Sequence, residues 1–175
     1  MRSIAITFGT TTLIVFLTLV QCVWAQSVVP HAAGVDQFGH AVEPEITVVA
    51  ADASARPGQT IQLVVHVRTK AGLHLLPARP DDRYLIPTSL VIEGTRNLAL
   101  VGTEWPAAIR LSGQPTRVMP AEFDVRVIVQ VATEVSSDSV VAAMRVRFQQ
   151  CDAHGCYIPQ SMRVPIVVPI AGAGL

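Results

Sequence analysis

The sequence predicts an all-β fold built of antiparallel strands, and two observations carry this prediction. In stretches 61–68, 123–131 and 144–148, apolar and polar residues alternate, which is typical of strands with one buried face. No stretch shows the amphipathic 3.6-residue period of a helix. Further strands are expected at 45–51, 88–93, 98–103 and 162–168. About seven short strands around a single core predict an antiparallel β-sandwich of the immunoglobulin type.

Turn residues separate the expected strands. Turns are predicted at 56–58, 70–72, 94–97 and 136–138, where Gly, Pro, Asn, Asp and Ser gather. Pro165 and Pro169 share one face of the last expected strand, which predicts an edge strand, because an edge tolerates a missing N–H group. Two long irregular segments, 73–87 and 104–120, are candidates for function, since loops of that length in a compact sandwich are often functional.

Composition and charge exclude several classes of function. The 175 residues include 13 basic and 13 acidic side chains, so the formal net charge is zero. A neutral chain argues against a nucleic-acid partner, which would favour a basic surface. Lys70 is the one lysine, so a polybasic membrane-binding patch is not expected either. Three cysteines are too few for a disulfide-dense mini-protein.

The N-terminus predicts an export signal. A positive start at Arg2 is followed by a mostly apolar run at 4–20 and by small or tolerated residues at 23–25. We therefore expect a cleaved signal peptide at 1–25, a flexible lead-in at 26–44 and one domain at 45–175. The alternatives are an uncleaved anchor and a lipoprotein attached through Cys22. With no second apolar run of spanning length, we expect no stable membrane insertion after cleavage and a periplasmic or exported location.

Cleavage would remove Cys22 and leave Cys151 and Cys156, which have four residues between them. These four, 152–155, are predicted to form a hairpin loop in which Gly155 is free to adopt positive φ. Residues that face each other in an antiparallel pair have Cα atoms about 4.5–5.5 Å apart, which overlaps the range of about 4.4–6.8 Å for disulfides. The two cysteines can therefore bond without movement of the backbone.

Spacing alone leaves the role of this pair open between redox exchange and structural stabilisation. A staple across so short a loop contributes only about 2 kcal/mol in the chain-entropy model. A local disulfide on a turn is easier to exchange, and protonated His154 could favour a neighbouring thiolate. A copper site is a further alternative, since soft ligands gather here: Cys151, His154, Cys156 and Met162, with His66 or His74 more distant.

At this point the motifs resemble a known family. Residues 148–159, Phe-Gln-Gln-Cys-x4-Cys-Tyr-x-Pro, resemble the active-site hairpin of the N-terminal periplasmic domain of the thiol:disulfide interchange protein DsbD. Residues 72–74 and 84–88 are similar to the first half of that domain, so the resemblance covers roughly 45–170. It implies an immunoglobulin-like fold, and 104–120 would be its cap loop, with Trp105 as the nearest aromatic residue.

The resemblance also implies a function and a site. Cys151 and Cys156 would be the redox pair, with Phe148 and Tyr157 as aromatic walls, and no cofactor or metal is implied. The chain would relay electrons to or from periplasmic thioredoxin-fold proteins, including isomerases and cytochrome c maturation components. As a stand-alone copy of protein-disulfide reductase type, it would receive electrons in trans. The alternatives are a non-enzymatic interaction domain with a structural disulfide and a copper-binding protein.

Overall fold

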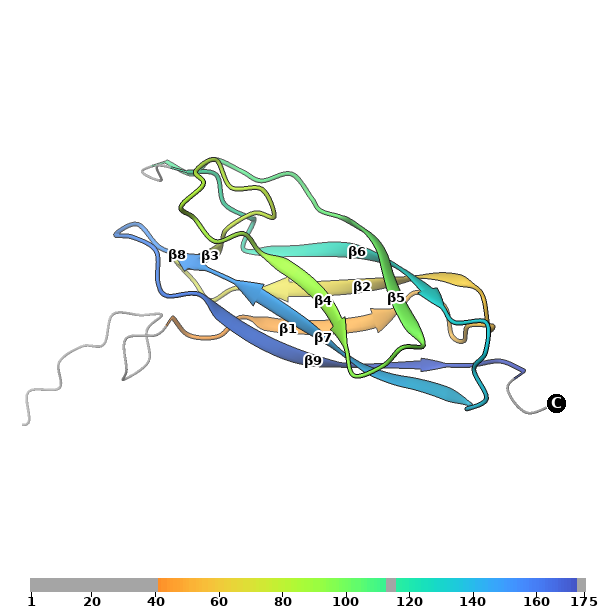
Figure 1. Cartoon of the computed structure of the whole chain (residues 1–175). Helices are drawn as coiled ribbons and strands as arrows, with labels where there is room; N and C mark the ends of the chain where they lie inside the picture. The colour runs from red at the N-terminus through yellow and green to blue at the C-terminus, as the bar shows by residue number, and fades with distance from the viewer. Residues whose placement is uncertain (1–40, 113–115, 173–175) are drawn as a thin grey trace, which may run out of the picture. The chain divides into compact units, whose positions relative to one another are not determined.

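The computed structural model describes residues 41–112 and 116–172, which form nine strands and no helix (Figure 1). The strands are β1 Glu45–Ala50, β2 Thr60–Arg68, β3 His74–Leu75, β4 Ser89–Glu93, β5 Leu98–Glu104, β6 Glu122–Val131, β7 Ser139–Phe148, β8 Gln150–Cys151 and β9 Gln160–Pro169. The predicted all-β class is confirmed. The predicted signal peptide and most of the lead-in lie outside the described residues.

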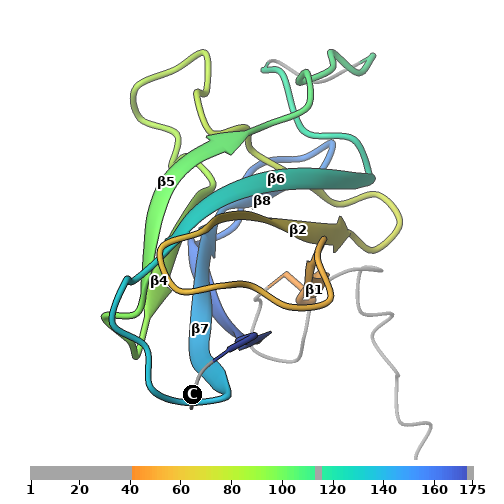
Figure 2. The ribbon, with the colours of Figure 1, turned by 90° about the vertical axis from the view of Figure 1, so that its right-hand side faces the viewer.

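The strands form two main antiparallel sheets, seen as separate layers in Figure 2. One sheet has the order β1-β2-β6-β5 and the other the order β4-β7-β9, while β3 and β8 pair with each other. Alternation in β2, β6 and β7 turns one face of each strand to the interior, and the registers Leu63↔Val127 and Val65↔Val125 align the apolar positions of β2 and β6. The core therefore lies between the two sheets, as expected for a sandwich.

Strand positions agree with the sequence prediction except in three places. β7 begins at Ser139 rather than at 144, because residues 139–143 include the exposed apolar residue Val141, which hides the alternation. β3 and β8 were not predicted, since two residues are too few to show a period of two. Both short strands lie next to the cysteine pair, so the missed elements are those that position the candidate site.

The predicted edge strand and the predicted turns are present, the turn at 136–138 as a bend between β6 and β7. β9 pairs with β7 on one side, and Pro165 and Pro169 lie on its exposed face opposite Ala143 and Ser139. An edge position lets both prolines lack an N–H group without loss of a ladder hydrogen bond. Three turns hold a glycine in the left-handed region, with φ of 77° at Gly58, 80° at Gly72 and 82° at Gly94.

The last residues of the predicted lead-in contact the domain. Ala41 is buried, and its carbonyl oxygen accepts a hydrogen bond from the side chain of Gln160 (3.1 Å). The carbonyl oxygen of Val42 accepts one from Gln150 (3.1 Å). These contacts place the start of the described chain beside β8 and β9.

Two valines on β7 provide a test of this packing. Val146 is 1% exposed and Val141 is 65% exposed. Val146→Ala removes buried methyl groups and leaves a cavity, so we expect the free energy of unfolding to fall by about 2–3 kcal/mol. Val141→Ala, the same change on the outer face, should stay within about 0.5 kcal/mol of wild type. Urea unfolding of both variants measures the difference, and equal losses would contradict the assigned faces of β7.

Candidate functional site

The candidate site is a disulfide on the hairpin that follows β7. Cys151 ends β8, and Cys156 faces it through an isolated antiparallel bridge, with an S–S bond between them. Their Cα atoms are 3.9 Å apart, closer than either range used in the sequence prediction. The amide of Asp152 donates to the carbonyl of Gly155 (2.9 Å), and the amide of Tyr157 donates to that of Gln150 (2.8 Å). Backbone pairing therefore holds the cysteines opposite each other on both sides of the disulfide.

The two cysteines differ sharply in exposure. Cys151 is 1% exposed and packs with Leu76 and Val118 in a small cluster separate from the main core, with Leu85 and Leu111 against it. Cys156 is exposed. The side chains around Cys151 come from the first loop (residues 76–88) and the second loop (residues 105–121). Two segments far apart in sequence therefore meet over Cys151, whereas Cys156 stays exposed.

Asp152 organises the turn between the cysteines. Its Oδ1 atom accepts hydrogen bonds from the amides of His154 (2.7 Å) and Gly155 (3.0 Å), and its Oδ2 atom accepts one from the hydroxyl of Tyr157. Burial by itself would raise the pKa of Asp152, but these three hydrogen bonds and the nearby His154 outweigh it and lower the pKa. The hydrogen bond between the Tyr157 hydroxyl and Asp152 raises the pKa of Tyr157. Gly155 does not adopt the positive φ allowed for it, because the Asp152 side chain closes the turn instead.

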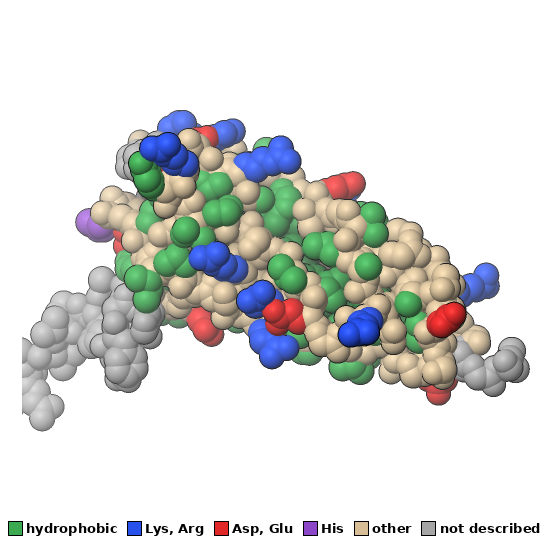
Figure 3. Space-filling model, in the orientation of Figure 1, with side chains coloured by type: hydrophobic (Ala, Val, Ile, Leu, Met, Phe, Trp, Pro, Cys, Tyr) green, Lys and Arg blue, Asp and Glu red, His purple; other side chains and the backbone are tan. Residues whose placement is uncertain are grey.

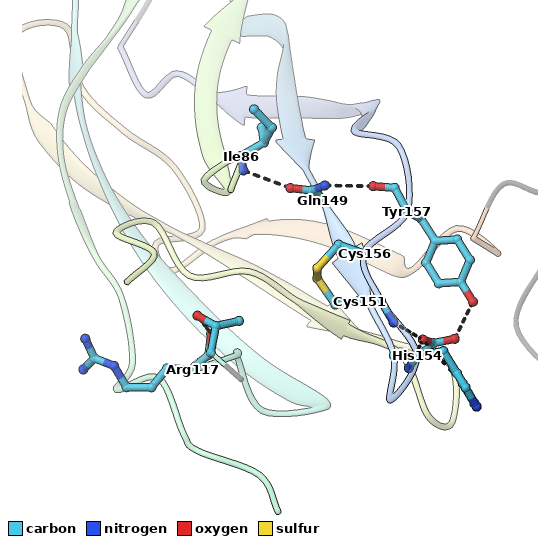
Figure 4. Close-up of a disulfide and its surroundings, with 10 residues drawn as sticks. Ile86, Arg117, Gln149, Cys151, His154, Cys156 and Tyr157 are labelled. Carbon is cyan, nitrogen blue, oxygen red and sulfur yellow. Dashed lines mark hydrogen bonds and ion pairs between the residues drawn. A yellow bond between two sulfur atoms is a disulfide. The ribbon is translucent and has the colours of Figure 1, made fainter. Parts of the chain in front are cut away.

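Gln149 connects the hairpin to the first loop, as Figure 4 shows. Its side-chain amide donates to the carbonyl of Tyr157 (2.9 Å), and its side-chain oxygen accepts from the amide of Ile86 (2.9 Å). The amide of Leu76 in turn donates to the Gln149 carbonyl (3.0 Å). The sequence motif includes Gln149, but no role was predicted for it, since a glutamine that follows a strand has no distinctive pattern.

An ion pair joins the first and second loops. The Arg117 side chain binds the carboxylate of Asp81 at 2.6 Å and 3.0 Å, and its backbone amide binds the same carboxylate at 3.2 Å. The hydrogen bonds from Arg117 lower the pKa of Asp81, with a smaller contribution from Arg110. Nothing in the sequence pairs Asp81 with a residue 36 positions away. Figure 3 shows basic side chains gathered on this part of the surface.

The other predicted site residues take different places. His154 is on the exposed turn, its side chain 93% exposed and its Nδ1 atom 3.8 Å from Asp152, and in Figure 4 its ring points away from the disulfide. Phe148 is fully buried in the main core, whereas Tyr157 lies beside the cysteines and binds Asp152. Trp105 packs against the main core and lines a cleft of about 530 Å³ with Arg79 and Arg117. The roles predicted for His154, Phe148 and Tyr157 stay predictions.

Two further residues considered as copper ligands, His66 and Met162, lie elsewhere in the fold. His66 on β2 binds Asp124 on β6 through its Nδ1 atom, and Met162 on β9 packs against the main core. Within residues 41–112 and 116–172, no three His, Cys, Asp or Glu side chains are grouped so that they could hold a metal ion. No helix long and apolar enough to cross a membrane is found in that part of the chain.

Comparison of the chain with known proteins finds similarity to a solved structure. No protein-family model and no curated protein sequence matches the chain. Among solved structures, the fold is similar to the crystal structure of the DsbD N-terminal domain of Neisseria meningitidis in the reduced form. The match has a TM-score of 0.41 and 13% sequence identity, and it covers 71% of this chain and 85% of that chain.

The hydrogen bonds of Asp152 predict a pH-dependent stability. Because the pKa of Asp152 is lower in the folded chain than its ordinary value, the carboxylate stabilises the fold above about pH 4, and this contribution is lost as the pH falls further. Asp152→Asn should lower the free energy of unfolding at pH 7 by about 1–2 kcal/mol, since bonds to a charged acceptor are lost.

The difference between Asp152→Asn and wild type should narrow as the pH falls from 6 toward 2, because protonation of the wild-type carboxyl removes its charge. Urea unfolding at several pH values measures this. The control is Asp52→Asn, because Asp52 is exposed and makes no hydrogen bond or ion pair with the described residues. A constant difference between Asp152→Asn and wild type across this range would show that the charge of Asp152 is unimportant.

Proposed function

We propose that this chain is a thiol–disulfide interchange module that relays electrons through Cys151 and Cys156 to or from periplasmic thioredoxin-fold proteins. The observation that carries the proposal is the difference in exposure within a disulfide borne on a short hairpin: Cys156 is exposed and Cys151 is covered by two loops. The proposed location depends on the export signal predicted at 1–25.

The exposure difference favours a defined order of exchange. An incoming thiolate can reach the exposed sulfur of Cys156, form a mixed disulfide there and release Cys151, which takes up the proton that the attacking thiol lost. The second thiol of the partner then attacks the mixed disulfide at the partner's own sulfur. This step releases Cys156 as a thiol and leaves the partner oxidised, so two electrons and two protons have moved. The reverse sequence reduces a partner disulfide, with Cys156 attacking and Cys151 resolving.

The alternative of a purely structural disulfide finds less support in the same geometry. The turn is already closed by backbone hydrogen bonds on both sides of the disulfide and by the three bonds to Asp152. Closing a loop of this length adds only about 2 kcal/mol in the chain-entropy model. A staple of such small effect would not need one of its sulfurs to be exposed.

Single-cysteine variants test the proposal. The variants are made in the chain without the predicted signal peptide, so that Cys22 is absent. We expect Cys151→Ser, which leaves the exposed Cys156 as the free thiol, to attack a single-cysteine thioredoxin-fold protein whose thiol is carried as a mixed disulfide with thionitrobenzoate. The Cys156 thiolate forms the protein–protein disulfide and releases the thionitrobenzoate anion. Cys156→Ser, the matched control, leaves only the buried thiol and should form that adduct more than about tenfold more slowly, because access limits exchange. Non-reducing electrophoresis and mass spectrometry measure the adduct.

The outcomes separate the two functions. Adduct formation through Cys156, together with a reduction potential of the wild-type disulfide between about −120 and −270 mV, supports electron relay. If neither variant forms an adduct and the potential lies below about −300 mV, the disulfide is structural and the chain is better described as an interaction domain.

A further inference from the structure

The short strand β3 places His74 directly opposite Cys151. The β3–β8 register pairs His74 with Cys151 and Leu75 with Gln150. Residues opposed in an antiparallel pair project their side chains to the same face, with Cβ atoms about 4.5–5.5 Å apart. Leu76, two residues beyond His74, packs against Cys151, which agrees with this assignment of the face. The imidazole of His74 is therefore the polar group that the fold brings next to the buried sulfur.

The hydrogen bonding of this ring is incomplete. The Nδ1 atom of His74 is buried and has no hydrogen-bond partner among the described residues. The backbone of Met119 raises the pKa of His74 and so partly offsets the effect of burial. Because Nδ1 has no partner, we assign the ring proton to Nε2. A proton on Nε2 leaves Nδ1 as a bare acceptor. Burial lowers the pKa of His74, so the neutral ring is favoured and this acceptor is retained.

In the disulfide form, the cysteines provide no hydrogen-bond donor for Nδ1, since neither sulfur carries a hydrogen. Reduction changes that, because each sulfur gains one electron and one proton and Cys151 becomes a thiol in a covered site. Burial disfavours the thiolate, so the thiol keeps its S–H donor. A buried acceptor without a partner costs free energy, and a donor that appears only on reduction would remove that cost in the reduced form alone.

We propose that His74 is a positioning residue that stabilises the reduced state by accepting, at Nδ1, a hydrogen bond from the thiol of Cys151. This inference rests on the proposed redox function of the cysteine pair. In the exchange described above, the proton lost by the attacking partner thiol ends on Cys151, and the new S–H group then points to Nδ1. His74 thereby shifts the equilibrium of the pair toward the dithiol and takes no part in covalent chemistry.

Three substitutions at His74 separate this role from simple packing. His74→Leu removes both ring nitrogens. His74→Gln places an amide near the Nε2 position and can keep the Met119 contact, but it puts a carbon atom where Nδ1 was. His74→Asn places an amide oxygen near the Nδ1 position and cannot reach Met119. The equilibrium constant for reduction is measured for each full-length variant in dithiothreitol or glutathione buffers, with thiol content determined by mass spectrometry.

We expect His74→Leu and His74→Gln to lower the equilibrium constant for reduction by about three- to tenfold, the size of one hydrogen bond. His74→Asn should stay within about twofold of wild type. A tenfold change corresponds to about 30 mV for this two-electron couple. Equal constants in all four proteins would overturn the proposal. The proposal would also be overturned if His74→Gln had the wild-type equilibrium constant and His74→Asn a lower one. That result would assign the effect to the contact with Met119.

The wild-type protein provides a second measurement that does not depend on variants folding. In the reduced protein, the ¹⁵N resonance of His74 Nδ1 should move in the direction of an accepted hydrogen bond relative to the oxidised protein, while Nε2 stays protonated. An unchanged Nδ1 resonance would overturn the inference. Neither measurement uses a protein partner, so failure of partner exchange would refute the proposed function, whereas an unchanged equilibrium constant with intact exchange would refute only the role of His74.

Discussion

The site depends on burial of the chain from both faces where β7 passes into β8. Along β7, every second side chain enters the core, and the alternation continues through Phe148 to Gln150. At Cys151 it breaks, because Gln150 and Cys151 are adjacent and both are buried. Since neighbouring residues of a strand point to opposite faces, a second layer must cover Cys151. The first and second loops form that layer, and the difference between the two sulfurs follows from it.

Irregular loops can form such a layer only if their own polar groups are satisfied. The fold achieves this with bonds between distant segments. The amide of Met119 donates to the carbonyl of Leu75 (2.8 Å), and Ile109 and Val118 exchange two backbone bonds at 2.8 and 2.9 Å. The Asp81–Arg117 pair and the two bonds of Gln149 add side-chain connections. The cover over Cys151 is therefore part of the hydrogen-bonded structure.

These features combine in the proposed chemistry. The exposed sulfur is presented by a turn that Asp152 closes, so its position depends on a few local hydrogen bonds. The buried sulfur is held by strand pairing and by apolar contacts from elsewhere in the chain. An exchange module needs one sulfur that partners can reach and one that resolves the mixed disulfide. Strand pairing and apolar packing around Cys151 and the short turn that carries Cys156 meet both needs.

The periodicity and the turn residues of the sequence were sufficient to predict the all-β class, the long strands, the edge strand and the turns, because each depends on contacts between near neighbours and on burial of one face. The hairpin and the opposition of Cys151 and Cys156 were predictable for the same reason, since only four residues separate them. The exposure of each cysteine was not, because Leu76 and Val118 reach Cys151 from 75 and 33 positions away. The pairing of Asp81 with Arg117, the link made by Gln149 and the register of His74 with Cys151 likewise join segments with no common local pattern. Such contacts are decided only when the sheets pack and the loops close over them, which is why the tertiary structure alone determined which cysteine is buried and which is exposed.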